Sequence, residues 1–242
     1  MYIFTKIIRI IPNILTFLNL FFGCISVIFL QSKNFDKSAV FTLFSIIFDS
    51  LDGFFSRLIK NENKFGKELD SLADMVSFGI VPSIIVFLLL KSMKKKIPFI
   101  EWSSLFISIF SAYRLAKFNI NTSYNGLTTP VNTLFFSSLS IAITPSSIPI
   151  FFVKKNIVNM FITPTSILFM IFFSCYLLIS KIPMISFNFK GFSWKKNKIR
   201  YVFLLISTFL LLTLRTIALP CIIIFYIIIS ILMYFHRLKK SY

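Results

Sequence analysis

Four aspartates, Asp49, Asp52, Asp70 and Asp74, lie within 26 residues of a chain that is otherwise poor in acidic groups. The 242 residues contain only 8 Asp and Glu, and the segments on both sides of these four, here called the aspartate cluster, are apolar enough to lie in a bilayer. A charged side chain in hydrocarbon costs about 2.5–3.5 kcal/mol on insertion scales, so an intramembrane carboxylate usually serves a function. Cations are needed to hold four of them together.

Helical periodicity places these acids on two opposing faces. In the first helix, one face would carry Asp49, Asp52, Gly53 and Ser56, which occupy positions i, i+3, i+4 and i+7. In the next helix, one face would carry Gly66, Asp70 and Asp74, which occupy positions i, i+4 and i+8. Because the connection between the two helices is short, we expect antiparallel neighbours whose acidic faces meet inside the membrane.

This set of oxygen ligands suits hard divalent cations, Mg²⁺ or Mn²⁺, and not zinc. Two such ions about 3.5–4 Å apart are the usual apparatus for in-line displacement at phosphorus. Gly53 and Gly66 would let a bulky group approach the backbone, and Arg57 at the mouth of the site can bind a phosphate with two hydrogen bonds. Close helix packing is the alternative explanation for the two glycines. A divalent-cation transporter is the alternative for the acids, although transport does not require the glycines and Arg57 at these spacings.

The composition predicts an all-α polytopic membrane protein made of one integral domain, residues 1–242. Hydrophobic residues make up 57% of the chain and charged residues 14%, and the mean hydropathy is +0.85. Apolar runs predict about eight spans, at 12–31, 38–58, 70–90, 99–119, 130–151, 157–180, 200–214 and 217–235. Six of them are expected to form the helical core that carries the aspartate cluster, over about 11–180, and two extra spans are expected at about 200–235. These last two could form a tight hairpin, or one could be re-entrant.

The distribution of basic residues predicts that both termini are cytoplasmic. With this orientation, 17 of the 26 Lys and Arg lie on the cytoplasmic side, as does the aspartate cluster. The run Lys94-Lys95-Lys96 is the main exception. The net charge of +18 is distributed over short loops, so it indicates topology and anionic lipid, and no nucleic acid.

Other residues with metal or nucleophile chemistry are scarce. Cys24, Cys175 and Cys221 are isolated in apolar segments, and His236 is the only histidine. Their spacing predicts neither a zinc site nor a disulfide framework, and the single histidine argues against histidine-based catalysis.

The aspartate cluster resembles the signature of the CDP-alcohol phosphatidyltransferase family. The pattern D-x2-D-G-x2-[AS]-R-x8-G-x3-D-x3-D is matched by Asp49, Asp52, Gly53, Ser56, Arg57, Gly66, Asp70 and Asp74, with Ser56 where the family usually has Ala. The resemblance implies that the four aspartates hold two divalent cations, Mg²⁺ or Mn²⁺. It places the CDP-diacylglycerol head over Gly53 and Gly66, near Ser56 and Arg57. Asp74 would be the general base that takes the proton of the acceptor hydroxyl, with CMP leaving.

Further stretches are similar to the phosphatidylserine synthase branch of that family. They are "IPNILTFLNLFFG" at 11–23, "FGKELDSLADMVSFGIVPS" at 65–83, "RLAKFN" at 114–119, "GLTTP" at 126–130 and "LLISKIPMISFNFKG" at 177–191. This similarity implies L-serine as the acceptor, phosphatidylserine as the product and a homodimer. It also implies a location in the bacterial inner membrane with the active site facing the cytoplasm. Glycerol 3-phosphate or inositol phosphate is the alternative acceptor.

The residues that would bind serine are less well defined. The carboxylate of serine needs a cation, and Arg114 is the candidate because it lies in an otherwise apolar helix. Asn119, Thr128 and Thr129 are weaker candidates. Arg114 could instead reach the membrane interface or act as a topology signal. The basic residues Lys181, Lys190, Lys195 and Lys196 are expected to contact anionic lipid headgroups.

Overall fold

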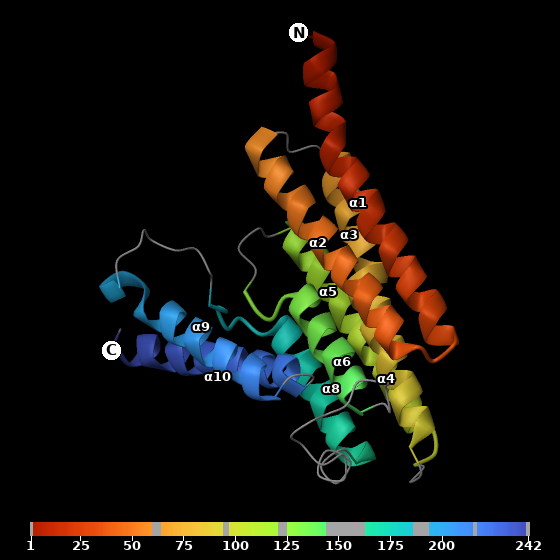
Figure 1. The fold of residues 1–242 in the computed structure, drawn as a ribbon, viewed down its shortest axis with the longest axis vertical. Helices are drawn as coiled ribbons and strands as arrows, with labels where there is room; N and C mark the ends of the chain where they lie inside the picture. Colours follow the sequence, from red (N-terminus) through yellow and green to blue (C-terminus); the bar gives the residue numbers. More distant parts are fainter. Residues whose placement is uncertain are drawn as a thin grey trace.

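The computed structural model describes residues 2–59, 64–93, 97–120, 125–143, 163–185, 194–214 and 217–240, with side chains from Ile10 to Phe235 apart from 194–196. Within these ranges the regular elements are all helical, as the composition predicts. They are α1 (Tyr2–Gln31), α2 (Phe35–Ile59), α3 (Lys64–Asp74), a π-helical turn (Met75–Ile80), α4 (Val81–Ser92), a 3₁₀ turn (Ile100–Ser104), α5 (Leu105–Ile120), α6 (Thr129–Ile143), α8 (Pro164–Ile179), α9 (Trp194–Leu214) and α10 (Ala218–Lys240). Figure 1 shows α1 to α8 as a bundle.

The helices have the length and surface of membrane-spanning elements. In the described ranges, five stretches are long and apolar enough to cross a bilayer: Ile10–Gln31, Phe35–Ile59, Lys64–Ser92, Asn197–Leu214 and Ala218–Phe235. The apolar helices α6 and α8 are shorter, and the predicted parts of their spans at 144–151 and 157–162 lie outside the described residues. Large apolar side chains face outward on many helices, as Phe169 (70% exposed) and Leu212 (75% exposed) illustrate. An outward apolar surface of this extent fits lipid as the solvent.

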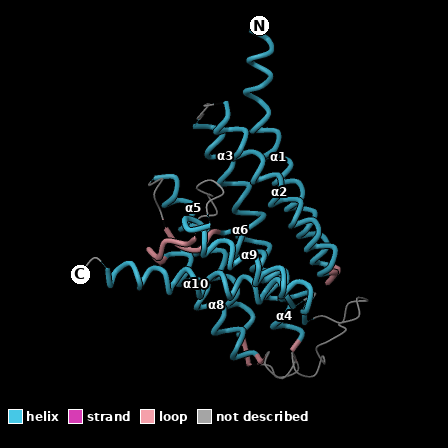
Figure 2. Tube along the Cα trace, turned by 60° about the vertical axis from the view of Figure 1, so that its left-hand side comes forward, coloured by secondary structure: helices cyan, strands magenta, loops and turns pink. Residues whose placement is uncertain are grey.

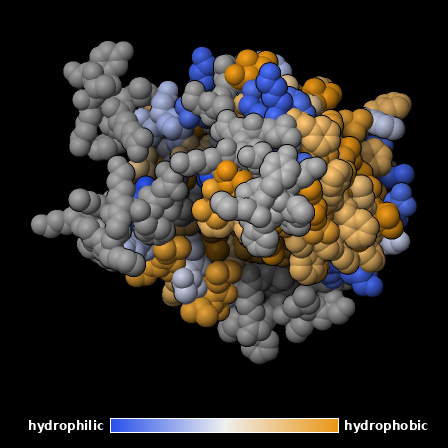
Figure 3. Space-filling view, turned by 90° about the horizontal axis from the view of Figure 1, so that it is seen from above, coloured by the Kyte–Doolittle hydropathy of each residue, from blue (hydrophilic) through white to orange (hydrophobic). Residues whose placement is uncertain are grey.

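Figure 3 looks along the bundle and shows how widely this apolar surface extends beside smaller hydrophilic groups. The interior contains hydroxyl and amide side chains buried between helices, beside buried hydrophobic side chains. Ser26 of α1, for example, lies 2.7 Å from the Ser38 hydroxyl and 2.9 Å from the Thr42 hydroxyl of α2. Small polar residues that pair across helices are typical of packing in membranes.

The third predicted span is longer than the apolar pattern indicates and has a local irregularity. A continuous helical stretch runs over Lys64–Ser92, and its α-helical hydrogen bonding widens to a π-helical turn at Met75–Ile80, directly after Asp74. Neighbouring helices supply hydroxyls to the carbonyls of this turn. Ser108 donates to Gly79 at 3.1 Å, and Thr133 donates to Phe78 at 3.0 Å.

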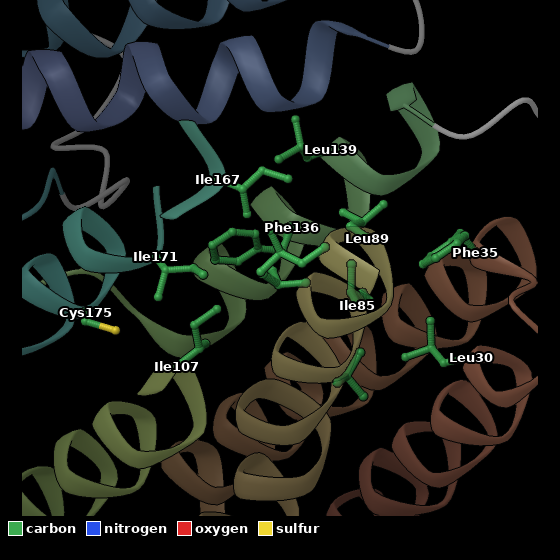
Figure 4. Close-up of a cluster of buried hydrophobic side chains, with 13 residues drawn as sticks. Leu30, Phe35, Ile85, Leu89, Ile107, Phe136, Leu139, Ile167, Ile171 and Cys175 are labelled. Carbon is green, nitrogen blue, oxygen red and sulfur yellow. The ribbon is translucent and has the colours of Figure 1, made fainter. Parts of the chain in front are cut away.

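A hydrophobic core fixes the lower half of the bundle. Figure 4 shows its side chains, which come from α4, α5, α6 and α8, from the end of α1 and from the start of α2. Phe136, Ile107 and Ile171 are fully buried at its centre, and the free Cys175 packs beside them. This core holds α4 in place, and α4 continues upward into the helix that carries Asp70 and Asp74.

The C-terminal helices α9 and α10 lie side by side and run across the direction of the bundle in both views (Figures 1 and 2). The rings of Phe203 and Phe225 stack with centroids 5.8 Å apart, and Phe203 also meets the edge of Tyr226. The segment before α9 is attached to α10, because Tyr226 donates to the Ile185 carbonyl at 3.2 Å. The two helices therefore pair as a hairpin.

Candidate active site

Three carboxylates converge from two helices. Asp49 comes from α2, Asp70 and Asp74 come from α3, and each offers one oxygen such that all three oxygens lie within 4.8 Å of one another. Among the described residues, no hydrogen-bond donor reaches the buried Oδ1 of Asp70. Carboxylates at this separation repel one another unless a cation lies between them. An all-oxygen donor set with an unsatisfied buried oxygen fits Mg²⁺ or Mn²⁺.

The helices that carry these acids are not packed directly on one another, contrary to the expected pair of neighbours. α2 and α3 run in opposite directions but make few backbone contacts, and α1 packs along both of them (Figure 1). The carboxylates therefore face each other across a separation that α1 bridges. Bound ions and a nucleotide head need such space between the two acidic faces, which direct packing would remove.

Asp52 lies outside the group of three. It is buried on α2, and its Oδ2 accepts a 2.8 Å hydrogen bond from the Thr16 hydroxyl of α1. Its predicted role as a metal ligand stays a prediction.

The first helix supplies a layer of polar side chains that the sequence reasoning did not assign to the site. Asn13, Thr16 and Asn19 follow one another at intervals of three residues, and each faces a residue of the predicted site. The Asn13 Oδ1 lies 3.0 Å from where a Cβ would stand on Gly66, and the Asn19 amide donates to Asp74 at 3.1 Å. Their spacing could have assigned these residues to the site from the sequence alone, because a polar stripe in an apolar span must face a polar partner.

The two predicted nucleotide glycines have different surroundings. A Cβ built on Gly53 would meet no atom of the described chain within 4 Å beyond its own helix, so close helix packing does not explain this glycine. Gly66 is approached by Asn13 of α1. Arg57 is exposed, and its Nε donates to the Gly53 carbonyl at 2.9 Å, so its side chain folds back along its own helix toward Gly53. Ser56, one residue before it, is half-buried.

Arg114 is buried rather than extended to the membrane interface. It is 7% exposed, and its Nη1 donates to the Thr129 hydroxyl at 3.4 Å, which links α5 to the first residue of α6. The turn before α6 requires glycine, because Gly126 has φ 117° and a Cβ there would lie 2.7 Å from the Ser180 carbonyl oxygen. Thr128 is exposed.

Asn119 connects the end of α5 to α3. Its carbonyl accepts from Lys67 at 2.7 Å, and its side chain accepts from Ser71 at 3.1 Å. Of the predicted headgroup contacts, Lys181 is exposed, Lys190 lies outside the described residues, and the side chains of Lys195 and Lys196 are not described.

Comparison with known proteins agrees with this geometry. The model of the CDP-alcohol phosphatidyltransferase family matches residues 9–189. Over 112 residues the chain is 40% identical to the CDP-diacylglycerol–serine O-phosphatidyltransferase of Helicobacter pylori, a match that covers 46% of each protein. It is 32% identical over 114 residues to the protein of the same name in Bacillus subtilis (47% of this chain, 63% of the relative). It is 29% identical over 137 residues to the archaetidylserine synthase of Methanothermobacter thermautotrophicus (53% and 56%).

The chain thus spans about half the length of the curated relatives it matches. The family match, in contrast, runs from α1 through α8 and contains every residue of the aspartate cluster. The chain belongs to the CDP-alcohol phosphatidyltransferase family.

Proposed function

We propose that this protein transfers a phosphatidyl group from CDP-diacylglycerol to L-serine, giving phosphatidylserine and CMP. The observation that carries the proposal is the convergence of Asp49, Asp70 and Asp74 beside the open space over Gly53, in a chain of this family. A polar site between apolar helices lets the acyl chains of the donor stay in the bilayer while its pyrophosphate reaches the carboxylates. A cation transporter would have no use for a glycine and an arginine arranged around open space.

Serine as the acceptor is supported by the relatives. The names of those from Helicobacter and Bacillus contain both CDP-diacylglycerol and serine, and the archaeal relative is named for a serine lipid with a different lipid part. All three names thus contain serine, whereas the part of the name that describes the lipid differs. Arg114, which is buried beside the first residue of α6, suits an acceptor with one carboxylate.

The mechanism assigns a role to each part of the site. Two divalent cations, Mg²⁺ or Mn²⁺, held by the aspartate cluster would neutralise the pyrophosphate and the charge that develops on the leaving phosphate. Gly53 and Gly66 admit the cytidine diphosphate head, and Arg57 with Ser56 lies beside it. Asp74 takes the proton of the serine hydroxyl as that oxygen bonds to the lipid-bearing phosphorus. The bond from this phosphorus to the CMP oxygen breaks in the same displacement.

We also infer that the site faces the cytoplasm of a bacterial inner membrane. The basic residues favour this orientation, although Lys94 to Lys96, which lie outside the described residues, count against it. A single cysteine at Asn34 should then react with a membrane-impermeant thiol reagent added to intact cells, and one at Glu68 should not. The reverse pattern would contradict the orientation. A homodimer, inferred from the family resemblance, should show twice the monomer mass after subtraction of detergent; a monomer mass would contradict it.

Product analysis tests the proposed function. Membranes that contain the protein receive CDP-diacylglycerol and Mn²⁺ with serine, glycerol 3-phosphate or inositol phosphate, and the lipid product is identified by mass spectrometry. Phosphatidylserine, formed only with serine, is the expected result. Phosphatidylglycerophosphate or a phosphoinositol lipid would overturn the acceptor but keep the reaction class. Cation flux without CMP release would overturn both.

A further inference from the structure

Asn19 lies at the point where α1 meets both acid-bearing helices. It is fully buried, and its side-chain Nδ2 donates to the Asp74 Oδ1 at 3.1 Å across 55 residues of sequence. Burying an amide in a membrane helix is costly unless its groups are bonded. The reason for Asn19 therefore has to be found in what it contacts.

The hydrogen bonds around Asn19 fix which way its amide points. The Ser45 hydroxyl of α2 donates to the amide Oδ1 and also lies 2.9 Å from the peptide oxygen of Asn19. The Ser77 hydroxyl reaches the same peptide oxygen at 3.2 Å, which leaves the Ser45 proton for the amide oxygen. With Oδ1 engaged by Ser45, the donor nitrogen is the atom that faces Asp74.

The close approach of α1 to the π-helical turn makes this contact possible. A Cβ on Gly23, one turn after Asn19, would lie 3.1 Å from the Cα of Ser77 and still nearer its hydroxyl. Ser77 belongs to the π-helical turn that directly follows Asp74. Asn19 thus holds the Asp74 side chain with its amide and the turn after Asp74 with its peptide oxygen.

We propose that Asn19 is a positioning residue that sets the orientation of the Asp74 carboxylate. The inference rests on the proposed function, in which Asp74 helps to hold the cations and takes the serine proton. A carboxylate beside Asp49 and Asp70 is driven to rotate away from these like charges. A neutral amide donor restrains it without adding a positive charge that would compete with the cations, and partners of metal ligands commonly contribute 10–100-fold in affinity or activity.

The test is a double-mutant cycle on purified protein in detergent, read by electron paramagnetic resonance titration with Mn²⁺ alone. Asn19→Leu removes the donor at similar volume. In the protein that keeps the native Asp74, Asn19→Leu should weaken Mn²⁺ binding by roughly 10- to 100-fold. In the Asp74→Ala background, which has no side-chain acceptor at residue 74, the same change should alter Mn²⁺ binding by less than about twofold. Ser26→Ala, which breaks another buried link between α1 and α2, is the matched control and should leave Mn²⁺ binding unchanged.

Equal weakening in both backgrounds, or none in either, would overturn the positioning role. If Asn19→Leu does not fold, as judged by thermal unfolding, Asn19→Ala takes its place in the cycle. In serine-dependent CMP release, Asn19→Leu should lower kcat and leave the KM for CDP-diacylglycerol unchanged. Loss of CDP-diacylglycerol affinity with unchanged kcat would also contradict the role. If the double-mutant cycle gives the expected result but the wild-type protein makes no phosphatidylserine, the proposed function is refuted and the positioning role stands.

Discussion

Thr16 of the first helix donates a 2.8 Å hydrogen bond to Asp52 of the second, and both side chains are buried. The same hydroxyl also lies 3.0 Å from the Pro12 carbonyl oxygen of its own helix, which is a second acceptor for its one proton. This contact makes α1 a support for the second acid of α2 as well as for Asp74. Its consequence is that changes in α1, which contributes none of the predicted ligands, should alter the metal dependence of the proposed reaction.

Thr16→Val should lower the apparent affinity for Mn²⁺ if Asp52 is a ligand. The substitution keeps the shape of the side chain and removes the donor, so Asp52 is left without its partner. The Mn²⁺ concentration for half-maximal activity should rise by roughly 10-fold. Thr42→Val makes the same chemical change at a buried α1–α2 contact away from the aspartates and serves as the control. The same rise in both variants would show that Thr16 acts through packing alone.

Gly53→Ala should lower activity without lowering the stability of the fold. The open space around Gly53 accommodates a methyl group, and alanine in a helix interior is favoured over glycine by about 0.5–1 kcal/mol. The variant should therefore unfold at the same or a higher temperature. Its kcat/KM for CDP-diacylglycerol should fall by roughly 10- to 100-fold, because the nucleotide head is displaced.

The control for Gly53→Ala is Ser50→Ala on the exposed side of the same helix, which should match wild type in both measurements. Full activity in Gly53→Ala would place the nucleotide elsewhere.

Gly23→Ala should have the opposite effect on stability. The added methyl group meets the backbone of Ser77 at 3.1 Å, so α1 has to move away from the π-helical turn. Overpacking of this kind costs about 1–3 kcal/mol. Thermal unfolding should occur at a lower temperature, and the hydrogen bond from Asn19 to Asp74 should weaken with it, lowering kcat. Unchanged stability and kcat would show that α1 and the turn are less closely packed than described.

Arg114→Gln should raise the KM for serine without changing the KM for CDP-diacylglycerol. Loss of a charge-assisted contact to the serine carboxylate predicts a rise of roughly 10-fold or more. Lys117→Gln removes another cation of the same helix, one whose ammonium lies 4.8 Å from the Tyr113 ring centre, and should leave both constants unchanged. Steady-state kinetics with each substrate varied decide the matter. Equal rises in the two constants of Arg114→Gln would mean that the arginine supports the fold and not the acceptor.

Helical periodicity was sufficient to predict that Asp49 faces Asp70 and Asp74, because spacing determines which side chains share a helix face. It could not show that α1 packs along both α2 and α3, because that depends on which helices are neighbours in space. Asn19 was therefore visible as a polar residue in an apolar span, but its partner Asp74 was not. The π-helical turn left no signal in the apolar pattern, since its carbonyls are satisfied by Ser108 and Thr133 of other helices.

The apolar pattern also placed the beginning of α9 imprecisely. α9 begins at Trp194 and not at residue 200, because a helix continues through the polar residues at its end once its apolar part is packed. The crosswise direction of α9 and α10 (Figure 1) could not be predicted from hydropathy, because hydropathy indicates the length of an apolar segment and not its direction.

Asp74→Asn tests most directly whether Asp74 serves as the base in serine-dependent phosphatidyl transfer. CMP release by the purified protein is measured with CDP-diacylglycerol and Mn²⁺, with and without serine, alongside binding of CDP-diacylglycerol to both proteins. The wild type should release CMP only with serine, one for each phosphatidylserine formed. Asp74→Asn should bind CDP-diacylglycerol measurably and release no CMP. Substantial serine-dependent turnover by Asp74→Asn would contradict the account, because another group would then be taking the proton.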